Sequence, residues 1–275
     1  MEQKVILLTG SSRGLGKATA IALAKENHKV YATMRNPSVV TDFDDVPNIT
    51  LQQLDVTDNA SIEAAVAEII ENEKRIDVVI NNAGYALFSP VEMATERETF
   101  DQFNVNVFGV LRVMQRVLPQ MRQQKSGHII NISSIAGIVS NPGLGIYCAT
   151  KHAIEAISAS LASTVFPWNI KVTVVQPGPT ATNFFESMAI GSRLQESNPY
   201  EAFAKRYQER FSKIIQEGQP PEEVAELIAS IIRMENPDFR YQTSPRLEEL
   251  ATRFVTDPTG NIWVNEQKEN FSDWF

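Results

Sequence analysis

The sequence predicts an α/β protein in which a mostly parallel sheet of seven strands carries helices on both faces. Short runs of β-branched and aliphatic residues alternate with longer stretches of helical periodicity through the first two thirds of the chain, which is typical of βαβ units. The chain has 275 residues, of which 43% are hydrophobic and 21% charged, so one large domain can bury its own core. We therefore expect a single three-layer, doubly wound domain over residues 1–275.

Each element follows from a local pattern. The expected strands cover residues 5–9, 30–34, 49–54, 77–81, 128–133, 171–176 and, as a seventh strand, 239–243. The expected helices cover residues 14–26, a stretch that starts after the capping residues Thr57-Asp58, residues 95–123 and 145–166, and a capped helix after Pro220-Pro221-Glu222-Glu223.

Two segments fall outside the alternating pattern. Residues 183–218 form a polar, helix-compatible insertion, and insertions at the carboxyl end of a sheet often cover ligands. This insertion carries several aromatic side chains, which either form an apolar substrate cover or pack a surface helix; they are Phe184, Phe185, Tyr200, Phe203, Tyr207 and Phe211. Residues 244–275 are expected to form a tail with turns at Asp257-Pro258 and Thr259-Gly260.

Charge and composition exclude several classes of function. A net charge of -8 and a pI near 5.1 argue against a nucleic-acid binder, because such proteins need an excess of lysine and arginine. The single cysteine, Cys148, cannot form an intramolecular disulfide, and the first residues show no signal peptide, so we expect a cytoplasmic protein. No apolar run is long enough to span a bilayer, and the three histidines are too scattered to predict a metal site.

A glycine-rich turn follows the first expected strand. The chain there reads Thr9-Gly10-Ser11-Ser12-Arg13-Gly14-Leu15-Gly16. Glycines at this place permit a tight turn and let backbone amides approach a pyrophosphate at the start of the next helix. A glycine cluster alone also fits a plain strand-to-helix turn, but its position between strand and helix favours a Rossmann-type dinucleotide site.

The residue that ends the second strand bears on the choice of cofactor. In dinucleotide folds an acidic residue at this place usually binds the ribose 2′-hydroxyl, whereas this strand ends Thr33-Met34-Arg35. Arg35 and Arg13 could both bind a 2′-phosphate through charge-assisted hydrogen bonds. We therefore expect NADP(H) in preference to NAD(H); the alternative is that Arg35 is a solvated loop residue.

Tyr147 and Lys151 lie four residues apart on an expected helix and so share one face of it. This spacing alone carries little information, but Ser134 follows the fifth expected strand at a sheet edge where ligands bind. A tyrosine that exchanges a proton near neutrality needs its pKa lowered by about three units. One cation at about 4 Å in an effective dielectric near 20 supplies about that, so Lys151, helped by a positively charged nicotinamide, is sufficient in magnitude.

Six motifs between residues 5 and 182 occur together in a fixed order. They are Thr9-Gly-x-x-x-Gly14-x-Gly16, Asn81-Asn82-Ala83-Gly84, Asn106 within Asn-Val-Phe-Gly, Ser134, Tyr147-x-x-x-Lys151, and Pro177-Gly178 with Thr182. This set resembles the short-chain dehydrogenase/reductase family. The runs at residues 30–35, 240–243 and 257–260 further resemble the branch that contains 17β-hydroxysteroid and retinol dehydrogenases.

The resemblance implies a catalytic role for four residues. Tyr147 would donate a proton to a carbonyl during reduction or remove it from an alcohol during oxidation, while hydride moves to or from the nicotinamide. Ser134 would hydrogen-bond the reacting oxygen, and Lys151 would hold the nicotinamide ribose and lower the tyrosine pKa. Asn106 would anchor a water in the proton relay; alternatively it is an ordinary polar residue inside a helix.

The resemblance also implies a set of cofactor contacts. Asp55 matches the residue that contacts adenine, unless it only forms the turn before its helix, and Thr182 matches the one near the carboxamide. The residues expected to contact the cofactor are Gly10, Ser12, Arg13, Gly14, Leu15, Gly16, Arg35, Asp55, Val56, Asn82, Ala83, Gly84, Tyr147, Lys151, Pro177, Gly178, Thr180 and Thr182.

The branch suggests a bulky apolar alcohol or ketone as substrate, such as a steroid, a retinoid or a related carbonyl, by analogy only. In this family the long helices from Asn106 and Tyr147 normally build a subunit interface, so we expect a homodimer or homotetramer. The alternative function is a catalytically idle NADP(H)-binding regulator or scaffold, which would have no need for the four catalytic residues.

Overall fold

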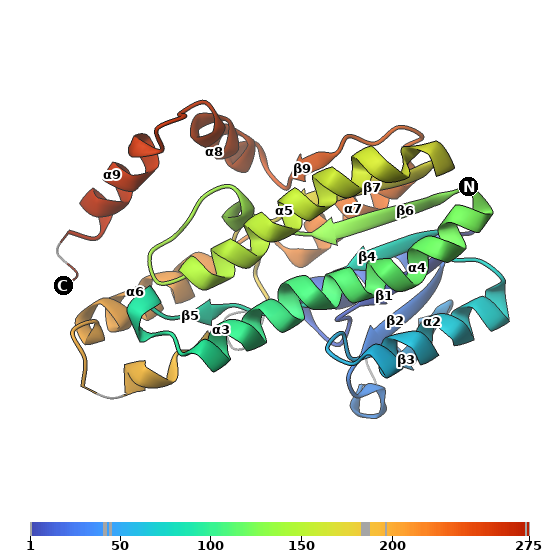
Figure 1. The fold of residues 1–275 in the computed structure, drawn as a ribbon, viewed down its shortest axis with the longest axis horizontal. Helices are drawn as coiled ribbons and strands as arrows, with labels where there is room; N and C mark the ends of the chain where they lie inside the picture. The colour runs from blue at the N-terminus through green and yellow to red at the C-terminus, as the bar shows by residue number, and fades with distance from the viewer. Residues whose placement is uncertain are drawn as a thin grey trace.

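The computed structural model describes residues 2–40, 43, 46–182, 188–195, 197–272 and 274, and a seven-stranded parallel sheet lies at its centre (Figure 1). The strand order is β3-β2-β1-β4-β6-β7-β9, and every neighbouring pair is parallel. The strands are β1 (Val5–Thr9), β2 (Lys29–Met34), β3 (Ile49–Gln53), β4 (Val78–Asn81), β6 (Gly127–Ile132), β7 (Ile170–Gln176) and β9 (Arg240–Gln242). The predicted fold class is confirmed.

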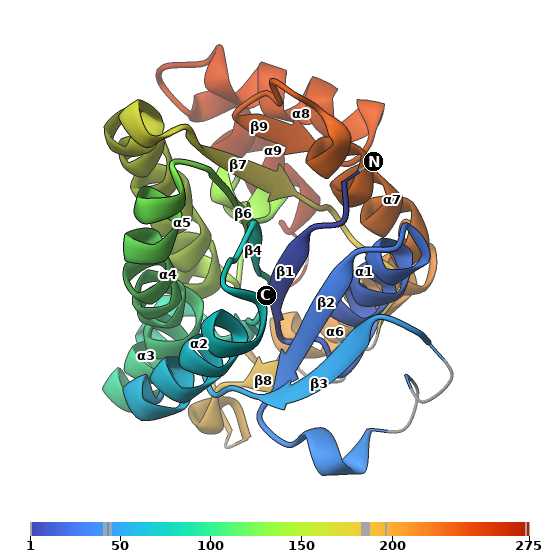
Figure 2. The same ribbon diagram turned by 90° about the vertical axis from the view of Figure 1, so that its right-hand side faces the viewer.

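Helices cover both faces of this sheet, which gives three layers (Figure 2). The helices of the sheet are α1 (Gly14–Lys25), α2 (Asn59–Glu73), α3 (Glu96–Phe103), α4 (Val110–Gln124), α5 (Gly145–Val165) and α7 (Pro221–Arg233). One apolar core joins the sheet to α2, α4 and α5, and a second joins its other face to α1 and α7. Because both faces are covered, β1 is buried along its whole length.

Local capping explains where several helices begin. The Asp58 carboxylate accepts a hydrogen bond from the Ala60 amide at 2.9 Å and so caps α2, as predicted. Thr95 and Glu98 form a reciprocal capping box at the start of α3. The cap predicted for α7 is wrong, because no side chain caps that helix; instead Pro221 occupies its first turn together with two acidic residues.

The structure adds a π-helical segment to the predicted long helix. Residues Asn104–Gly109 form this segment between α3 and α4. Such segments displace the backbone from the regular ladder and are frequent at functional sites. The segment contains Asn106, one of the four residues for which a catalytic role is expected.

Two further features lie at the carboxyl end of the sheet. A second, two-stranded sheet pairs β5 (Leu87–Phe88) with β8 (Ala189–Ile190), and α6 (Glu201–Gln216) follows it within the predicted insertion. The predicted tail contains two helices, α8 (Pro245–Val255) and α9 (Asn261–Asn270), joined by the turns predicted at residues 257–260. Together α6, α8 and α9 extend beyond the sheet (Figure 1).

Candidate active site

The predicted site residues gather at the carboxyl ends of the central strands. The strand order reverses between β1 and β4, since β2 and β3 lie to one side and β6 and β7 to the other. In open α/β sheets the two connections leave in opposite directions at such a point, and the crevice between them is where ligands bind. The glycine-rich turn follows β1, and Asn82 follows β4.

Two glycines of the turn adopt backbone conformations that other residues rarely adopt. Gly10 has φ +70° and Gly14 has φ +57°. A Cβ atom on Gly10 would lie 2.7 Å from the Cα of Ala83, which is closer than real Cβ contacts. The turn therefore needs glycine at position 10 for both its conformation and the space.

Asn82 holds this turn against β4. Its Nδ2 donates to the carbonyl oxygens of Thr9 at 3.0 Å and of Gly10 at 2.8 Å. The Thr9 hydroxyl in turn accepts hydrogen bonds from the amides of Asn82 and Ala83, both at 3.1 Å. A Cβ on Gly16 would lie 2.5 Å from the same Nδ2, so Gly16 leaves room for the clamp. The Asn82 side chain thus shapes the turn.

The segment after β7 lies against the glycine-rich turn. A Cβ on Gly14 would be 3.3 Å from the Thr182 Cβ, which places Thr182 beside the start of α1. Thr180 is buried and donates to the Gly178 carbonyl at 3.1 Å. The Pro177 carbonyl accepts from the Ile135 amide at 2.9 Å and ties this segment to the end of β6.

Arg13 and Arg35 end at the same edge of the sheet. Thr9 of β1 pairs with Thr33 of β2, and the Ser11 amide donates to the Thr33 carbonyl at 3.0 Å. Both arginines are exposed, and no described carboxylate forms an ion pair with either guanidinium. Two cations with no anionic partner in the described structure therefore flank the turn, as an anion site requires.

Asp55 and Val56 follow β3 at the same edge. One Asp55 carboxylate oxygen accepts from both the amide and the hydroxyl of Thr57 at 2.8 Å, so the alternative of a turn-forming role is correct for that oxygen. Val56 is buried, and its side chain lies where a Cβ on Gly109 would be only 2.8 Å away. Leu15 likewise packs against the apolar core that joins α1 to the sheet.

Tyr147, Ser134 and Lys151 come together as predicted. The Tyr147 hydroxyl shares a hydrogen bond with the Ser134 hydroxyl. The Lys151 ammonium lies 5.7 Å from the centre of the Tyr147 ring and donates to the Ile132 carbonyl at 2.9 Å. Tyr147 and Lys151 are 8% and 7% exposed, so the pair is screened from water. Ser134 stands at the end of β6 and accepts from the Ala136 amide at 3.1 Å.

Burial moves the two pKa values apart. It raises the pKa of Tyr147 above its ordinary value, against the lowering effect of the Ser134 hydrogen bond. It lowers the pKa of Lys151 to about 8, although the charge of Glu155 opposes this. The tyrosine pKa expected to be lowered by Lys151 together with a positively charged nicotinamide is therefore not lowered in the protein without cofactor, where desolvation of the phenol dominates.

Asn106 sits in the π-helical segment with its amide group fully used. Its Nδ2 donates to the Tyr85 carbonyl at 2.9 Å and to the Thr150 hydroxyl at 3.1 Å, while its Oδ1 accepts from the Tyr85 amide at 3.1 Å. The side chain therefore joins the loop after β4 to α5. Gln102 reinforces this junction by donating to the Tyr85 carbonyl at 2.6 Å, a contact that no motif in the sequence had indicated.

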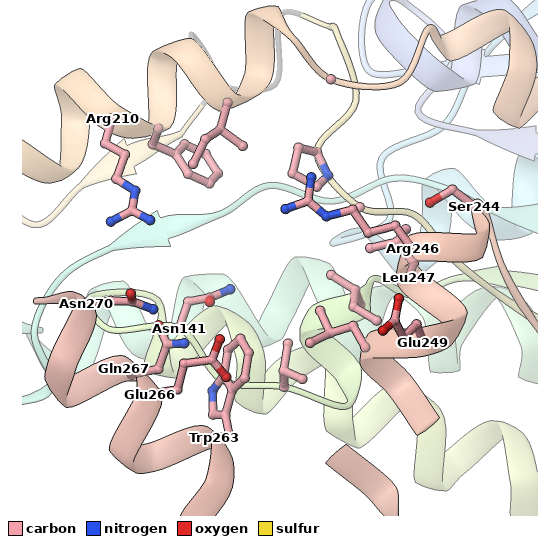
Figure 3. A pocket seen from close by; sticks show the side chains of 18 of the residues that line it. Asn141, Arg210, Ser244, Arg246, Leu247, Glu249, Trp263, Glu266, Gln267 and Asn270 are labelled. Carbon is pink, nitrogen blue, oxygen red and sulfur yellow. The ribbon is translucent and has the colours of Figure 1, made fainter. Parts of the chain in front are cut away.

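A cavity of about 700 Å³ opens between α6 and the C-terminal helices (Figure 3). Its wall includes Ile135, which follows Ser134, and Pro179 from the segment after β7. The cavity therefore lies next to the tetrad, which consists of Asn106, Ser134, Tyr147 and Lys151. Its apolar lining also draws on Leu247, Trp263 and Phe271 from the tail. The sequence had not indicated that the tail forms a wall.

One aromatic cluster connects the wall of this cavity, through Tyr207, to Tyr147. Phe88, Phe203 and Tyr207 form an apolar cluster that also contains Tyr147 itself. The ring centroids of Phe88 and Tyr207 are 4.5 Å apart. Of the predicted cover residues, Phe184 and Phe185 lie outside the described residues, and Phe203 and Tyr207 are packed rather than exposed.

Neither a metal centre nor a membrane span is found in the described part of the chain. No group of three or more His, Cys, Asp or Glu side chains there could hold a metal ion. No helix in the described ranges is both long and apolar enough to cross a bilayer.

Comparisons with known proteins agree with this geometry. The family model described as short chain dehydrogenase matches residues 4–191. The chain is 38% identical over 253 residues to a 3-ketodihydrosphingosine reductase of Bacteroides thetaiotaomicron, covering 92% of each chain. It is 32% identical over 290 residues to the 17-beta-hydroxysteroid dehydrogenase type 1 of Homo sapiens, covering 99% of this chain and 88% of the relative.

Solved structures give the same result. A short-chain dehydrogenase from Streptomyces avermitilis superposes with a TM-score of 0.82 at 31% identity, covering 99% of this chain and 97% of that one. A serine dehydrogenase complexed with NADP+ superposes with a TM-score of 0.75 at 27% identity, covering 86% and 93%. The chain therefore belongs to the short-chain dehydrogenase/reductase family and is an oxidoreductase that acts on alcohol or keto groups with a nicotinamide cofactor.

Proposed function

We propose that this protein is an NADP(H)-dependent alcohol dehydrogenase or carbonyl reductase in which Tyr147 transfers the proton. The observation that carries the proposal is the buried contact of Tyr147 with Ser134 and Lys151. A phenol, a hydroxyl donor and a cation in one dry site are the groups needed to protonate a carbonyl oxygen during reduction.

The glycine-rich turn fits a dinucleotide. Side chains at positions 10 and 16 would collide with Ala83 and Asn82, so glycine there allows the tight turn that can present backbone amides to a pyrophosphate. Arg13 is the N-cap of α1 and makes no side-chain capping bond, which leaves the first amides of that helix available to an anion. Asp55, Val56 and the loop from Asn82 to Gly84 complete the adenine and ribose side.

The remaining predicted contacts belong to the nicotinamide side. In this proposal Lys151 holds the nicotinamide ribose, and Pro177, Gly178, Thr180 and Thr182 line the carboxamide. The position of Thr182 against Gly14 supports a contact between this segment and the cofactor. Ser12, Leu15 and Gly16 support the turn from the start of α1.

Side chains of the protein transfer the proton and stabilise the charge that its transfer leaves. When bound, the reduced nicotinamide supplies a hydride to the carbonyl carbon. Tyr147 breaks its O–H bond and gives that proton to the carbonyl oxygen, so that the product is the alcohol, and the oxidation runs in reverse. Ser134 donates a hydrogen bond to the same oxygen, and Lys151 stabilises the tyrosinate that remains. Asn106 holds the loop and helix between which the relay water would sit.

NADP(H) is favoured over NAD(H) by charge. Arg13 and Arg35 are exposed at one edge of the sheet, where the 2′-phosphate of NADP(H) would lie. The strand end that usually carries an acidic residue carries Arg35 instead. A phosphate gains charge-assisted hydrogen bonds from such a pair, whereas a ribose hydroxyl gains much less.

The cavity supports a bulky apolar substrate. Its volume of about 700 Å³ is ample for a drug-sized molecule, and its wall reaches the neighbourhood of Ser134. Relatives include proteins named for a ketodihydrosphingosine and for 17-beta-hydroxysteroids, and both of these molecules have large hydrocarbon parts. In our proposal residues 183–218 and the tail at 244–275 cover this substrate within one catalytic domain.

Assembly and location follow the same reasoning. Exposed aromatic side chains, Phe108 in the π-helical segment and Phe166 and Trp168 after α5, lie on or beside the long helices. These helices are the interface expected for a homodimer or homotetramer. We propose a cytoplasmic enzyme on the basis of the single buried thiol of Cys148.

The test is an absorbance assay at the reduced-nicotinamide band. Steroid, retinoid, aliphatic and quinone carbonyls are offered with NADPH or NADH, and Tyr147→Phe is compared with Tyr31→Phe, a buried tyrosine that contacts Glu73 instead. We expect NADPH-dependent turnover that falls by about 10²- to 10⁴-fold in Tyr147→Phe only. Undiminished turnover of that variant contradicts the role of Tyr147. Tight NADPH binding without turnover of any carbonyl favours the idle regulator.

A further inference from the structure

A buried carboxylate stands one helical turn beyond Lys151. Glu155 is on α5 at the i+4 position from Lys151, and it is only 7% exposed. It packs against the turn that follows Ser134, because a Cβ on Gly137 would lie 3.0 Å from the Glu155 Cγ. An ionised group in such a place needs partners to offset its desolvation.

Those partners come from β7 and from the edge strand β9 beside it. Glu155 Oε1 accepts from Gln176 Nε2 at 2.8 Å, and Oε2 accepts from Arg240 Nε at 3.0 Å. Gln242 Nε2 donates to Gln176 Oε1 at 2.6 Å, which leaves the Gln176 amide nitrogen directed at Glu155. Both carboxylate oxygens are thus satisfied, and the carboxylate has little freedom to turn.

We propose that Glu155 is a positioning residue that keeps Lys151 protonated, and that the charge of Arg240 from β9 limits this effect by partly offsetting the charge of Glu155. The inference rests on the proposed role of Lys151 in the active site. It assigns a catalytic purpose to β9, which no motif in the sequence had connected with the site. Glu155 acts through Lys151 and does not touch the reacting atoms.

Among the described residues that surround Lys151, Glu155 is the one whose charge can stabilise the ammonium. From β6 the ammonium meets the Ile132 carbonyl, which is uncharged. On its own helix, the ammonium faces the neutral phenol of Tyr147. The turn after β6 and the π-helical segment, which both pack against α5, carry the uncharged Ser134 and Asn106. Glu155 is the described acid whose charge acts on Lys151.

The direction of the effect follows from electrostatics. Burial lowers the pKa of Lys151 to about 8, so this ammonium is close to losing its proton at neutral pH. The negative charge of Glu155 stabilises the ammonium and opposes that loss. Arg240 is positive and pairs with Glu155, so its charge partly offsets that of Glu155 and acts on Lys151 in the opposite sense. Removing the charge of Glu155 should therefore lower the pKa of Lys151, and removing the charge of Arg240 should raise it.

The first test follows Lys151 in the protein without cofactor. Lysine side chains are labelled with 13C at Cε, the Lys151 signal is identified by its loss in Lys151→Met, and its pKa is measured by NMR titration. Glu155→Gln should lower this pKa by about one unit, and Arg240→Gln should raise it. Glu71→Gln, which removes an exposed acid on α2, should leave it unchanged.

The second test uses the pH dependence of kcat/KM with NADPH and an accepted carbonyl. The alkaline limb should move to lower pH in Glu155→Gln, to higher pH in Arg240→Gln, and back toward the wild type in Glu155→Asp. If the role of Glu155 were purely structural, its substitution would reduce activity evenly at all pH values and leave the alkaline limb in place.

The outcomes separate the inference from the proposed function. A shifted lysine titration in a protein without any turnover supports the electrostatic link and contradicts the proposed function. If NADPH-dependent turnover is normal but neither the pKa of Lys151 nor the alkaline limb of kcat/KM moves in the variants, the inference is overturned and the proposed function stands. If Glu155→Gln does not fold, Arg240→Gln decides, because Arg240 is 38% exposed in its side chain; an unchanged or lowered lysine pKa in that variant overturns the inference.

Discussion

The ammonium of Lys151 lies 5.7 Å from the centre of the Tyr147 ring, and both side chains are buried. Burial makes the charged form of each residue less stable, so it raises the pKa of Tyr147 and lowers that of Lys151 to about 8. In the protein without cofactor the phenol therefore keeps its proton. This state is suited to donate a proton to a carbonyl.

The cost of burying Lys151 leads to a stability prediction. A pKa lowered to about 8 means that burial costs the charged lysine about 3 kcal/mol, whereas the hydrogen bond from its ammonium to the Ile132 carbonyl contributes about 1.5–3 kcal/mol. Lys151→Met should therefore unfold at an equal or higher urea concentration at pH 7 while it loses turnover. Lys25→Met, at an exposed position on α1, serves as the control.

The sign of the pH dependence checks the same point. The wild type bears the full cost of the charged lysine below pH 8, and that cost is relieved between about pH 8 and 10.5 as the folded protein loses the proton first. The stability advantage of Lys151→Met should therefore shrink over this range. A variant that is less stable than the wild type by 2 kcal/mol or more at pH 7 contradicts the argument.

The sequence predicted the sheet and the tetrad because both depend on local patterns. The run from Val5 to Thr9 is buried in full, and the Tyr147–Lys151 spacing places both side chains on one helix face. The partners of Glu155 were out of reach, since Arg240 lies 85 residues away and is brought close only by the edge strand β9. The pairing of β5 with β8 involves two residues on each side, too few for any periodicity.

The glycine-rich turn gives a prediction about space. Gly10→Ala should abolish NADPH binding and lower stability by more than 2 kcal/mol, because its Cβ would meet the Ala83 backbone at 2.7 Å in addition to the strain of φ +70°. Gly260→Ala is the matched control, since Gly260 has φ +69° with nothing within 4 Å of the added atom. Isothermal titration with NADPH and urea unfolding measure both effects. Equal losses in the two variants would show that only the backbone conformation matters.

Arg35 provides a test of cofactor choice. Arg35→Ser should raise the KM for NADPH by about tenfold or more and leave the KM for NADH nearly unchanged, because a charge-assisted hydrogen bond contributes about 1.5–3 kcal/mol. Arg97→Ser removes an exposed arginine on α3, which pairs with Asp101, and controls for net charge. Equal effects on the two cofactors would mean that Arg35 does not read the 2′-phosphate.

His128 predicts how acid destabilises the fold. Burial lowers its pKa to about 3, and its Nε2 lies 2.9 Å from the Thr173 hydroxyl, so the folded protein keeps it neutral. The unfolded chain takes up a proton near pH 6.5, so this contribution to stability is present above that pH and is lost as the pH falls toward 3. By pH 4 the loss is about 3 kcal/mol. Urea unfolding of His128→Gln should show a shallower decline, and parallel curves for variant and wild type would refute the assignment.

The C-terminal helix predicts a separation between cofactor and substrate binding. No described residue of α9 is buried; its Trp263 donates to the Ser140 carbonyl at 2.7 Å, and beyond it Phe271 packs with Phe203 at 5.9 Å between ring centroids. The helix thus spans the cavity and is anchored mainly at its two ends (Figure 3). Removal of residues 257–275 should leave the NADPH affinity within about twofold, because the glycine-rich turn lies elsewhere.

The same truncation should raise the KM for a bulky apolar carbonyl by about tenfold, since the loss of one buried aromatic contact costs about 1.5–3 kcal/mol. A small aliphatic carbonyl, which does not reach the tail, should keep its KM. Phe271→Ala should give a smaller effect in the same direction, because it removes one wall residue and keeps the helix. If the KM values for both carbonyls stay unchanged after truncation, the substrate does not occupy this cavity, and the aromatic cluster of α6 around Tyr147 becomes its remaining contact surface.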